Sequence, residues 1–259
     1  MVEIFRGRTA LVTGASAGIG AAMVRALAAR GADLVLVARR GDRLDALAEE
    51  CRARGVRALA VPVDLADPAA RAALAAAHPD VDLLINNAGL GVYGVFDETD
   101  WARTERLLAV NVAALTHLSR LYAPAMVARG FGRILQVASI VGFLPVPLFA
   151  AYGASKAYVV SLGLAMDAEL APRGVRVSVL CPGGTATEFF DVARGPDAAG
   201  HNPRRMMSAE AVARIGLDAM ASARTLVVAG GTNAATVFAL RFAPRALAAR
   251  AALWATRRR

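Results

Sequence analysis

The stretch RTALVTGASAGIG, residues 8–20, joins a short apolar run to a glycine-rich turn, and it decides how the rest of the chain is interpreted. Residues 8–13 have the aliphatic character of a buried strand, and an alanine-rich helical pattern begins at residue 18. Glycines at such a turn let the backbone bend tightly and let N–H groups at the helix N-terminus approach a pyrophosphate. The spacing G-x-x-x-G-x-G also occurs in plain strand-to-helix turns, but its place after the first predicted strand favours a dinucleotide site.

Short apolar runs and longer helical stretches alternate along the rest of the chain. The runs predict strands at 8–13, 33–38, 57–62, 82–86, 132–138, 174–180 and 224–229. The other stretches predict helices at 18–30, 41–54, 67–77, 99–128, 151–171 and 208–222. Continuous aliphatic runs are typical of parallel strands that are buried on both faces. The alternation therefore predicts an α/β fold, a single doubly wound Rossmann-type domain with helices on both faces of the sheet.

The composition and charge exclude several classes of protein. The 259 residues are 56% hydrophobic and 20% charged, unlike a disordered chain, and two cysteines do not make a secreted disulfide scaffold. The formal charge of +9 is concentrated at the C-terminal end, because residues 219–259 contain seven arginines and no acidic residue. The nearly neutral body that remains argues against a nucleic-acid-binding protein.

Two arginines, Arg39 and Arg40, stand at the end of the second predicted strand, where dinucleotide-binding proteins contact the adenosine ribose. A carboxylate at this place binds the ribose hydroxyls of NAD, whereas an arginine accommodates the 2′-phosphate of NADP. Asp42 lies too far into the next helix to act as that carboxylate. The missing acid favours NADP over NAD, and the alternative is that both arginines are ordinary solvated surface residues.

Tyr152 and Lys156 are four residues apart at the start of a predicted helix, so they share one face. We expect the lysine ammonium to lower the pKa of Tyr152, so that the phenol exchanges a proton with a carbonyl or alcohol oxygen. A Y-x-x-x-K pair is common by chance, but Lys156 is the only lysine of the chain and stands in an uncharged segment. Ser139 ends the fifth predicted strand and would hydrogen-bond the reacting oxygen, unless it only forms the turn there.

With these motifs in order, residues 5–230 resemble the short-chain dehydrogenase/reductase family. The matching motifs are TGASAGIG at 13–20, Asp64, NNAG at 86–89, Asn111 in VNV, Ser139, Y-x-x-x-K at 152–156 and PGGTAT at 182–187. Each motif is modest alone, and their order and spacing together are specific. The resemblance implies a seven-stranded parallel sheet of order 3-2-1-4-5-6-7 and reversible hydride transfer between nicotinamide C4 and a carbonyl carbon. Ala17 departs from the serine that is common in the family, and we expect no effect.

The resemblance also assigns roles to individual residues. The expected catalytic residues are Asn111, Ser139, Tyr152 and Lys156, and Asn111 would kink its helix and hold a water in a proton relay behind Lys156. The residues expected to bind NADP(H) are Gly14, Ser16, Ala17, Gly18, Ile19, Gly20, Arg39, Arg40, Asp64, Leu65, Asn87, Ala88, Gly89, Tyr152, Lys156, Pro182, Gly183, Thr185 and Thr187. No metal is expected, because the three histidines are far apart and have no ligand spacing.

Three segments that follow the fourth, fifth and sixth predicted strands are expected to face the substrate. They span residues 90–96, 140–149 and 188–207, and the predicted substrate residues are Tyr93, Val141, Phe143, Phe149, Phe189 and Phe190. The first two segments contain no charged residue, which favours an apolar aldehyde, ketone, sterol-like or acyl substrate. The third segment contains two glycines and two prolines, and it is predicted to be a mobile lid.

Residues 231–259 are expected to form a helical extension to a catalytic domain at residues 1–230. Two short helices, 233–243 and 244–256, are predicted, with Pro244 starting the second. The extension is apolar and purely cationic, which suits an anionic membrane surface, but Arg250 interrupts its apolar stripe. We therefore favour packing on the body or on a sister subunit over membrane binding. No apolar secretion signal precedes the first strand, so we expect a cytoplasmic protein, with peripheral contact to the inner membrane face as the alternative.

The function that these observations favour is an NADP(H)-dependent carbonyl reductase or alcohol dehydrogenase with an apolar substrate. A 3-oxoacyl-carrier-protein reductase is the alternative within the enzyme class. A catalytically silent NADP-binding sensor or scaffold is the alternative outside it, and the complete set of catalytic residues argues against that class. The resemblance also implies a homodimer formed through the predicted helices 99–128 and 151–171, with a tetramer as a further option.

Overall fold

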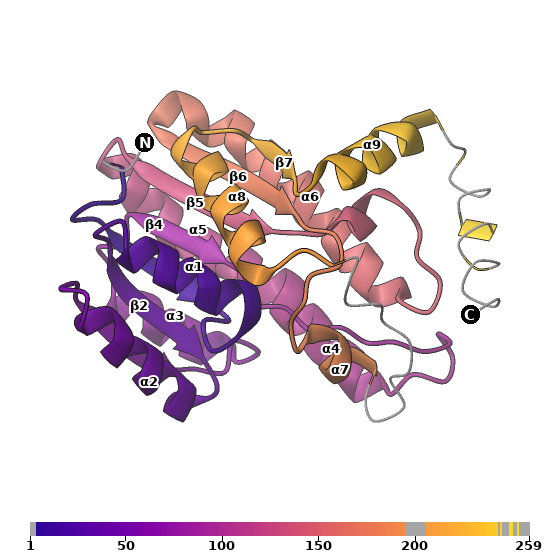
Figure 1. Cartoon of the computed structure of the whole chain (residues 1–259), viewed down its shortest axis with the longest axis horizontal. Coiled ribbons are helices and arrows are strands. Elements are labelled where there is room, and N and C mark those ends of the chain that lie inside the picture. The colour runs from indigo at the N-terminus through magenta and orange to yellow at the C-terminus, as the bar shows by residue number, and fades with distance from the viewer. Residues whose placement is uncertain (1–3, 195–205, 243, 245–248, 251–252, 254–259) are drawn as a thin grey trace.

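A seven-stranded parallel sheet of order β3-β2-β1-β4-β5-β6-β7 forms the centre of the molecule (Figure 1). The computed structural model describes residues 4–194, 206–242, 244, 249–250 and 253. The strands are β1 (Thr9–Thr13), β2 (Asp33–Ala38), β3 (Ala58–Pro62), β4 (Leu83–Asn86), β5 (Gly132–Val137), β6 (Val175–Cys181) and β7 (Leu226–Val228). All the strand pairs are parallel, which confirms the predicted strands, pairing and order.

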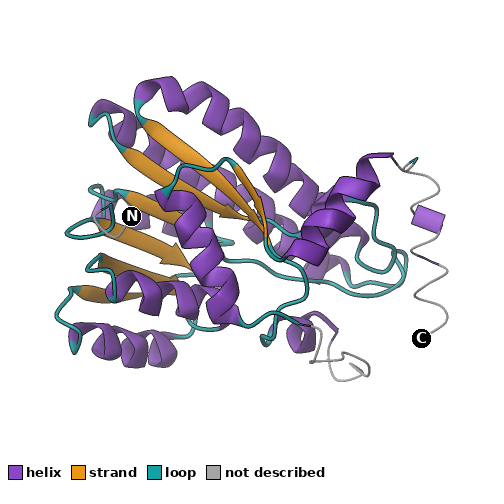
Figure 2. Ribbon diagram, turned by 45° about the horizontal axis from the view of Figure 1, so that its top comes forward, coloured by secondary structure: helices purple, strands orange, loops and turns teal. Residues whose placement is uncertain are grey.

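Helices cover both faces of this sheet (Figure 2). One face packs against α1 (Gly18–Ala28), α2 (Gly41–Arg52) and α8 (Ala209–Ala221). The other face packs against α3 (Pro68–Ala77), α5 (Leu115–Ala128) and α6 (Ala150–Leu170). Successive strand residues point to opposite faces, so that Val12 belongs to the first core and Leu11 to the second. The predicted doubly wound arrangement is confirmed, and it directs ligands to the carboxyl ends of the strands.

The helical stretch predicted over residues 99–128 is confirmed from Trp101 to Ala128, but it is not one regular α-helix. The structure has α4 (Trp101–Leu108), a π-helical turn at Ala109–Ala114 and then α5. A π-helical turn accommodates an extra residue within a helix, which the apolar periodicity of the sequence does not reveal. Asn111, where the resemblance implies a kink, lies within this turn.

The segment after β7 is helical, as predicted, and begins with α9 (Gly231–Ala239). A 3₁₀ turn at Leu240–Phe242 follows α9, so the helix predicted over 233–243 is shorter than expected. The predicted helix 244–256 lies mostly outside the described residues. In the predicted lid, α7 (Phe189–Arg194) is described, and residues 195–205 lie outside the described part.

Candidate active site

A cavity of about 430 Å³ lies at the carboxyl ends of the strands, and the glycine-rich turn after β1 forms one of its walls. Gly14 in this turn has a φ of +66°, and a Cβ added at Gly20 would lie 2.2 Å from the Gly14 carbonyl oxygen. Both positions therefore require glycine for the turn to pack against α1. Among the described residues, no side chain caps the N-terminus of α1, so its first N–H groups remain available to a phosphate.

Thr13 and Asn87 tie the glycine-rich turn to the end of β4. The Thr13 hydroxyl donates to the Ile85 carbonyl at 3.2 Å and accepts the backbone N–H groups of Asn87 and Ala88, both at 3.0 Å. The Asn87 side-chain amide donates to the Thr13 carbonyl at 2.9 Å. These bonds hold two neighbouring strand ends together beside the cavity. The sequence reasoning gave Thr13 no role, although it begins the glycine-rich motif.

Asn111 joins the π-helical turn to the segment after β4 and to α6. Its Nδ2 donates to the Leu90 carbonyl at 3.0 Å and to the Ser155 hydroxyl at 3.1 Å, and its Oδ1 accepts the Leu90 N–H at 2.8 Å. The side chain is 1% exposed and lies behind the residues that line the cavity. The structure therefore gives Asn111 a positioning role, and the water relay stays a prediction.

Lys156 is buried between α6 and the end of β5. Its Nζ donates to the Val137 carbonyl at 2.8 Å and lies 5.7 Å from the centroid of the Tyr152 ring. Burial lowers the pKa of Lys156 to about 8, because the ammonium is removed from water. Gly89 and Lys156 both line the cavity, and a Cβ added at Gly89 would lie 3.4 Å from Nζ. Because Gly89 has no side chain, the amine stays accessible from the cavity. The amine is mostly protonated at neutral pH.

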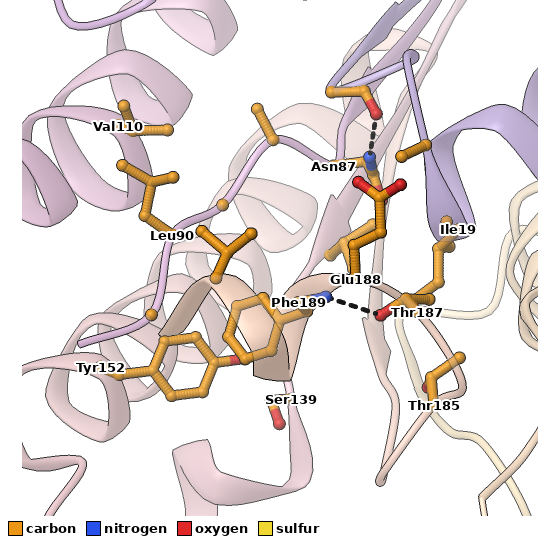
Figure 3. A pocket seen from close by; sticks show the side chains of 18 of the residues that line it. Ile19, Asn87, Leu90, Val110, Ser139, Tyr152, Thr185, Thr187, Glu188 and Phe189 are labelled. Atoms are coloured by element: carbon orange, nitrogen blue, oxygen red, sulfur yellow. Dashed lines mark hydrogen bonds between the residues drawn. The ribbon is translucent and has the colours of Figure 1, made fainter. Parts of the chain in front are cut away.

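Tyr152 and Ser139 bring two hydroxyl groups together at the cavity (Figure 3). Burial raises the pKa of Tyr152 to about 12, and its hydrogen bond with Ser139 only partly opposes that rise. The expectation that Lys156 lowers this pKa is wrong. The reason is geometric, because Nζ bonds to the Val137 carbonyl while burial dominates at the phenol.

The cavity unites the residues predicted to bind the cofactor, with one exception. Gly20 packs against Gly14 in the turn, and all the others line the cavity, together with Ser139. Leu90, Gly91, Ile140, Glu188 and Val192 also line the cavity, in segments that were predicted to face the substrate, and Gly184 lines it within the motif at 182–187. Arg106 and Val110 line it without a predicted role, because local sequence patterns carry no signal for the approach of this helical segment.

Arg40 lies at the end of the cavity that β2 and the glycine-rich turn form. Its Nε and Nη2 donate to the Ser16 hydroxyl at 3.2 and 3.1 Å, and its Nη1 donates to the Glu188 carboxylate at 2.8 Å. Arg43 on α2 donates to the other oxygen of the same carboxylate at 2.7 Å. Arg40 is therefore at the cavity, as predicted, and it is engaged by an acid that the sequence analysis did not connect with it.

Asp64 lies after β3 on the same side of the cavity. It accepts the Ala66 N–H at 3.0 Å and a guanidinium N–H of Arg106 at 2.5 Å. Burial alone would raise the pKa of Asp64, but these hydrogen bonds and the nearby Arg39 lower it below its usual value. The carboxylate is therefore ionised at neutral pH and fixed beside the predicted adenosine end.

Aromatic rings line the opposite end of the cavity. The ring centroids of Phe149 and Tyr152 are 5.7 Å apart, and Phe189 lies 5.1 Å from Tyr152 and over it in Figure 3. The predicted substrate residues that line the cavity are Val141, Phe149, Phe189 and Phe190. Two predictions need correction. Tyr93 packs behind Phe149 at 5.1 Å, and Phe143 packs on the apolar core beneath α6.

The site as a whole combines a phosphate-binding turn, a phenol and an amine that can exchange protons, and an apolar end. Within the described ranges, no group of three or more His, Cys, Asp or Glu side chains is arranged to hold a metal ion. The described helices include none that is long and apolar enough to cross a bilayer. This arrangement suits proton transfer at a substrate oxygen beside a bound dinucleotide.

Comparisons with known proteins give this geometry a family context. The family model described as short chain dehydrogenase matches residues 8–196. Galactitol 2-dehydrogenase (L-tagatose-forming) of Cereibacter sphaeroides is 43% identical over 191 residues, which are 72% of this chain and 75% of that protein. Ketoacyl reductase HetN of Nostoc sp. is 38% identical over 181 residues, which are 68% of this chain and 63% of HetN. These relatives carry the names of different substrates.

Two solved structures match most of the chain. A short-chain dehydrogenase from Sphingobium yanoikuyae in complex with NADPH is 36% identical, with a TM-score of 0.82, over 90% of this chain and 92% of that chain. A short chain dehydrogenase/reductase from Burkholderia phymatum in complex with NAD is 30% identical, with a TM-score of 0.81, over the same shares of the two chains. Similarity of fold is therefore compatible with either cofactor.

Proposed function

Because the chain belongs to the short-chain dehydrogenase family and is an oxidoreductase, we propose that it is an NADP(H)-dependent carbonyl reductase or alcohol dehydrogenase with an apolar substrate. The observation that carries the proposal is that Ser139, Tyr152 and Lys156 line the same cavity as the glycine-rich turn. A sensor or scaffold needs only the turn, so the presence of all three polar groups favours an enzyme.

The residues present fit a nicotinamide dinucleotide. A Cβ added at Gly18 would lie 2.9 Å from Thr187, so the start of α1 and the segment after β6 approach closely where a pyrophosphate would bind. The uncapped N-terminus of α1 would hold that pyrophosphate, and Arg40 would hold the adenosine end. When bound, the nicotinamide would supply hydride to a carbonyl carbon or accept it in the reverse direction.

The protein's own part in the reaction is proton transfer at the substrate oxygen. A phenol whose pKa is about 12 is protonated at neutral pH, so Tyr152 is ready to donate its proton to a carbonyl oxygen during reduction. The Ser139 hydroxyl would hydrogen-bond the same oxygen and hold it beside the phenol. Lys156 lines the same cavity and would help to hold the bound cofactor. Its Nζ bonds to the Val137 carbonyl and does not lower the pKa of the phenol.

The preference for NADP(H) rests on the charges at the adenosine end. No carboxylate stands directly at the end of β2, where Arg39 and Arg40 follow the strand, and Arg40 lines the cavity beside the Ser16 hydroxyl. A guanidinium and a phosphate form strong paired hydrogen bonds, which supports a cofactor with a 2′-phosphate. The relative solved with NADPH agrees with this proposal, whereas the relative solved with NAD keeps the alternative open.

An apolar carbonyl compound is the proposed substrate, because Phe149, Phe189 and Phe190 line the far end of the cavity. A 3-oxoacyl-carrier-protein reductase remains the second candidate, and the named activity of the relative HetN favours it. We also propose a cytoplasmic homodimer formed through α4, α5 and α6. The exposed apolar side chains Leu108, Tyr158 and Leu164 on these helices support that interface.

The experiment that tests the function follows NADPH oxidation with a panel of aldehydes, bulky ketones, sterol ketones and 3-oxoacyl thioesters. Tyr152→Phe should lower kcat by about 10²- to 10⁴-fold, which is the usual contribution of a positioned acid, while NADPH binding is largely kept. Tyr158→Phe is the matched control, because that tyrosine lies on the same helix outside the cavity and the substitution keeps the ring that the proposed dimer interface would use. We expect it to leave kcat unchanged.

The possible outcomes separate the candidate functions. Highest kcat/KM with a 3-oxoacyl thioester would favour the acyl-carrier-protein reductase over the general carbonyl reductase. NADPH binding without turnover of any compound in the panel would favour the sensor. Near-normal turnover of Tyr152→Phe would refute the role of the phenol.

A further inference from the structure

Glu188 lies between the two ends of the site (Figure 3), and its carboxylate binds two arginines at the predicted adenosine end. It accepts hydrogen bonds from Arg40 at 2.8 Å and from Arg43 at 2.7 Å, one on each oxygen. These bonds lower the pKa of Glu188, so it stays ionised at neutral pH. Arg40 and Glu188 both line the cavity, so the ion pair spans it from β2 to the segment after β6. We call the three residues Arg40, Arg43 and Glu188 the arginine clasp.

The clasp places a carboxylate on the guanidinium that is proposed to bind the 2′-phosphate. Arg40 already gives two N–H groups to Ser16 and a third to Glu188. These bonds use three of the five N–H groups of the guanidinium, so a phosphate that pairs with the other two lies close to the carboxylate, and the two anions repel each other at close range. A cofactor without the 2′-phosphate places no second anion beside Arg40, so the ion pair between Arg40 and Glu188 stays undisturbed.

The next residue along the chain connects the clasp to the catalytic phenol. Phe189 lies 5.1 Å from Tyr152 between ring centroids, and its backbone N–H donates to the Thr187 hydroxyl at 3.4 Å. Glu188 immediately precedes α7, and Phe189 is the first residue of that helix. One short segment therefore contributes a residue to each end of the site.

From this geometry we propose that Glu188 is a cofactor-specificity residue whose carboxylate competes with the 2′-phosphate for Arg40, so that it weakens the binding of NADPH and leaves the binding of NADH unaffected. The inference rests on the proposed NADP(H) function and deepens it. It predicts that removal of the carboxylate charge strengthens binding only of ligands that carry the 2′-phosphate.

The test compares cofactor binding by the full chain and by Glu188→Gln, which keeps the shape of the side chain and removes its charge. Adenosine 2′-monophosphate and adenosine 5′-monophosphate serve as further probes, because only the former carries the discriminating phosphate. We expect the Kd for NADPH and for the 2′-monophosphate to fall about two- to fivefold, as for the loss of exposed ion pairs. The Kd for NADH and for the 5′-monophosphate should not change.

Asp191→Asn provides the matched control. Asp191 lies three residues after Glu188, on α7, and is exposed, so this variant removes a negative charge from the same segment without touching Arg40. We expect all four dissociation constants to remain at their wild-type values. An Asp191→Asn variant that behaves like Glu188→Gln would reduce the effect to bulk charge and overturn the proposal.

Two other results would overturn it. Weaker NADPH binding by Glu188→Gln would mean that the carboxylate holds the bound cofactor, and equal tightening of NADPH and NADH would mean that it has no phosphate specificity. Binding of the two monophosphates by the wild-type chain distinguishes failure of the clasp proposal from failure of the proposed NADP(H) preference. If it binds the 2′-monophosphate no better than the 5′-monophosphate, the NADP(H) preference fails too; if it prefers the 2′-monophosphate and Glu188→Gln changes nothing, only the clasp fails.

Discussion

The amine of Lys156 can be titrated by itself, because the chain contains no other lysine. A chain labelled with ¹³C at lysine Cε should therefore show one resonance. We expect it to titrate with a midpoint at about 8 in the folded protein, because burial disfavours the ammonium, and near 10.5 in urea. The unfolded chain binds more protons between these two values, so Lys156 makes folding more favourable as pH rises through that window.

Arginine in place of the lysine, Lys156→Arg, removes the resonance and so confirms its assignment. A folded-state midpoint near 10.5 would show that the amine is solvated and would contradict the buried position of Nζ. The identities of Tyr152, Lys156 and Ser139 were predictable from motif and spacing. Their pKa values were not, because burial and the bond to Val137 arise only when α6 packs on β5.

Among the elements, the π-helical turn at Ala109–Ala114 depends most on one side chain. Asn111→Ala removes three hydrogen bonds and leaves the Leu90 N–H, the Leu90 carbonyl and the Ser155 hydroxyl without this partner. Buried polar groups that lose a partner cost stability, so we expect a loss of about 2–4 kcal/mol and a lower kcat from the displaced segment after β4. Urea unfolding followed by circular dichroism measures the first effect.

Thr116→Ala is the control at the start of α5. The Thr116 hydroxyl bonds to the Val112 carbonyl at 2.7 Å and to the Tyr158 hydroxyl at 3.0 Å in a more exposed place, so its loss should cost less than about 1 kcal/mol. Equal losses from the two variants would contradict a special role for Asn111. Sequence reasoning located this asparagine but predicted one continuous helix around it. The hydrogen bonds that favour the π-helical turn come from Leu90 and Ser155, which are distant in sequence.

For the whole molecule, the seven strands and their parallel arrangement were predictable because two constraints act together. Aliphatic runs such as residues 33–38 are buried on both faces, and right-handed crossovers limit how such strands connect. The order of the strands was predicted only from the resemblance to the family. The clasp between Arg40 and Glu188 joins residues 148 positions apart, on side chains that local patterns describe only as charged. Contacts of this kind become visible only once the sheet has brought the carboxyl ends of its strands together.

The same assembly makes α9 part of the support of the cavity and leads to a prediction about truncation. Asn233 on α9 donates to the Ala229 carbonyl at 2.6 Å, and a Cβ added at Gly183 would lie 2.4 Å from its Nδ2. Val237 is also buried, at 6% exposure. A chain ending at residue 230, the predicted domain boundary, should therefore lose about 2–4 kcal/mol of stability and bind NADPH more weakly.

A chain ending at residue 242 keeps these contacts and should match the full chain in both measurements, although it lacks most of the cationic extension. Thermal unfolding and NADPH titration of the three lengths distinguish the two boundaries. If the 230-residue chain were as stable as the full chain, the contacts of Asn233 and Val237 would contribute nothing and the boundary at 230 would be correct. The 242-residue chain could also bind NADPH as tightly as the full chain but unfold at a lower temperature. Residues 243–259 would then stabilise the body without contributing to the site.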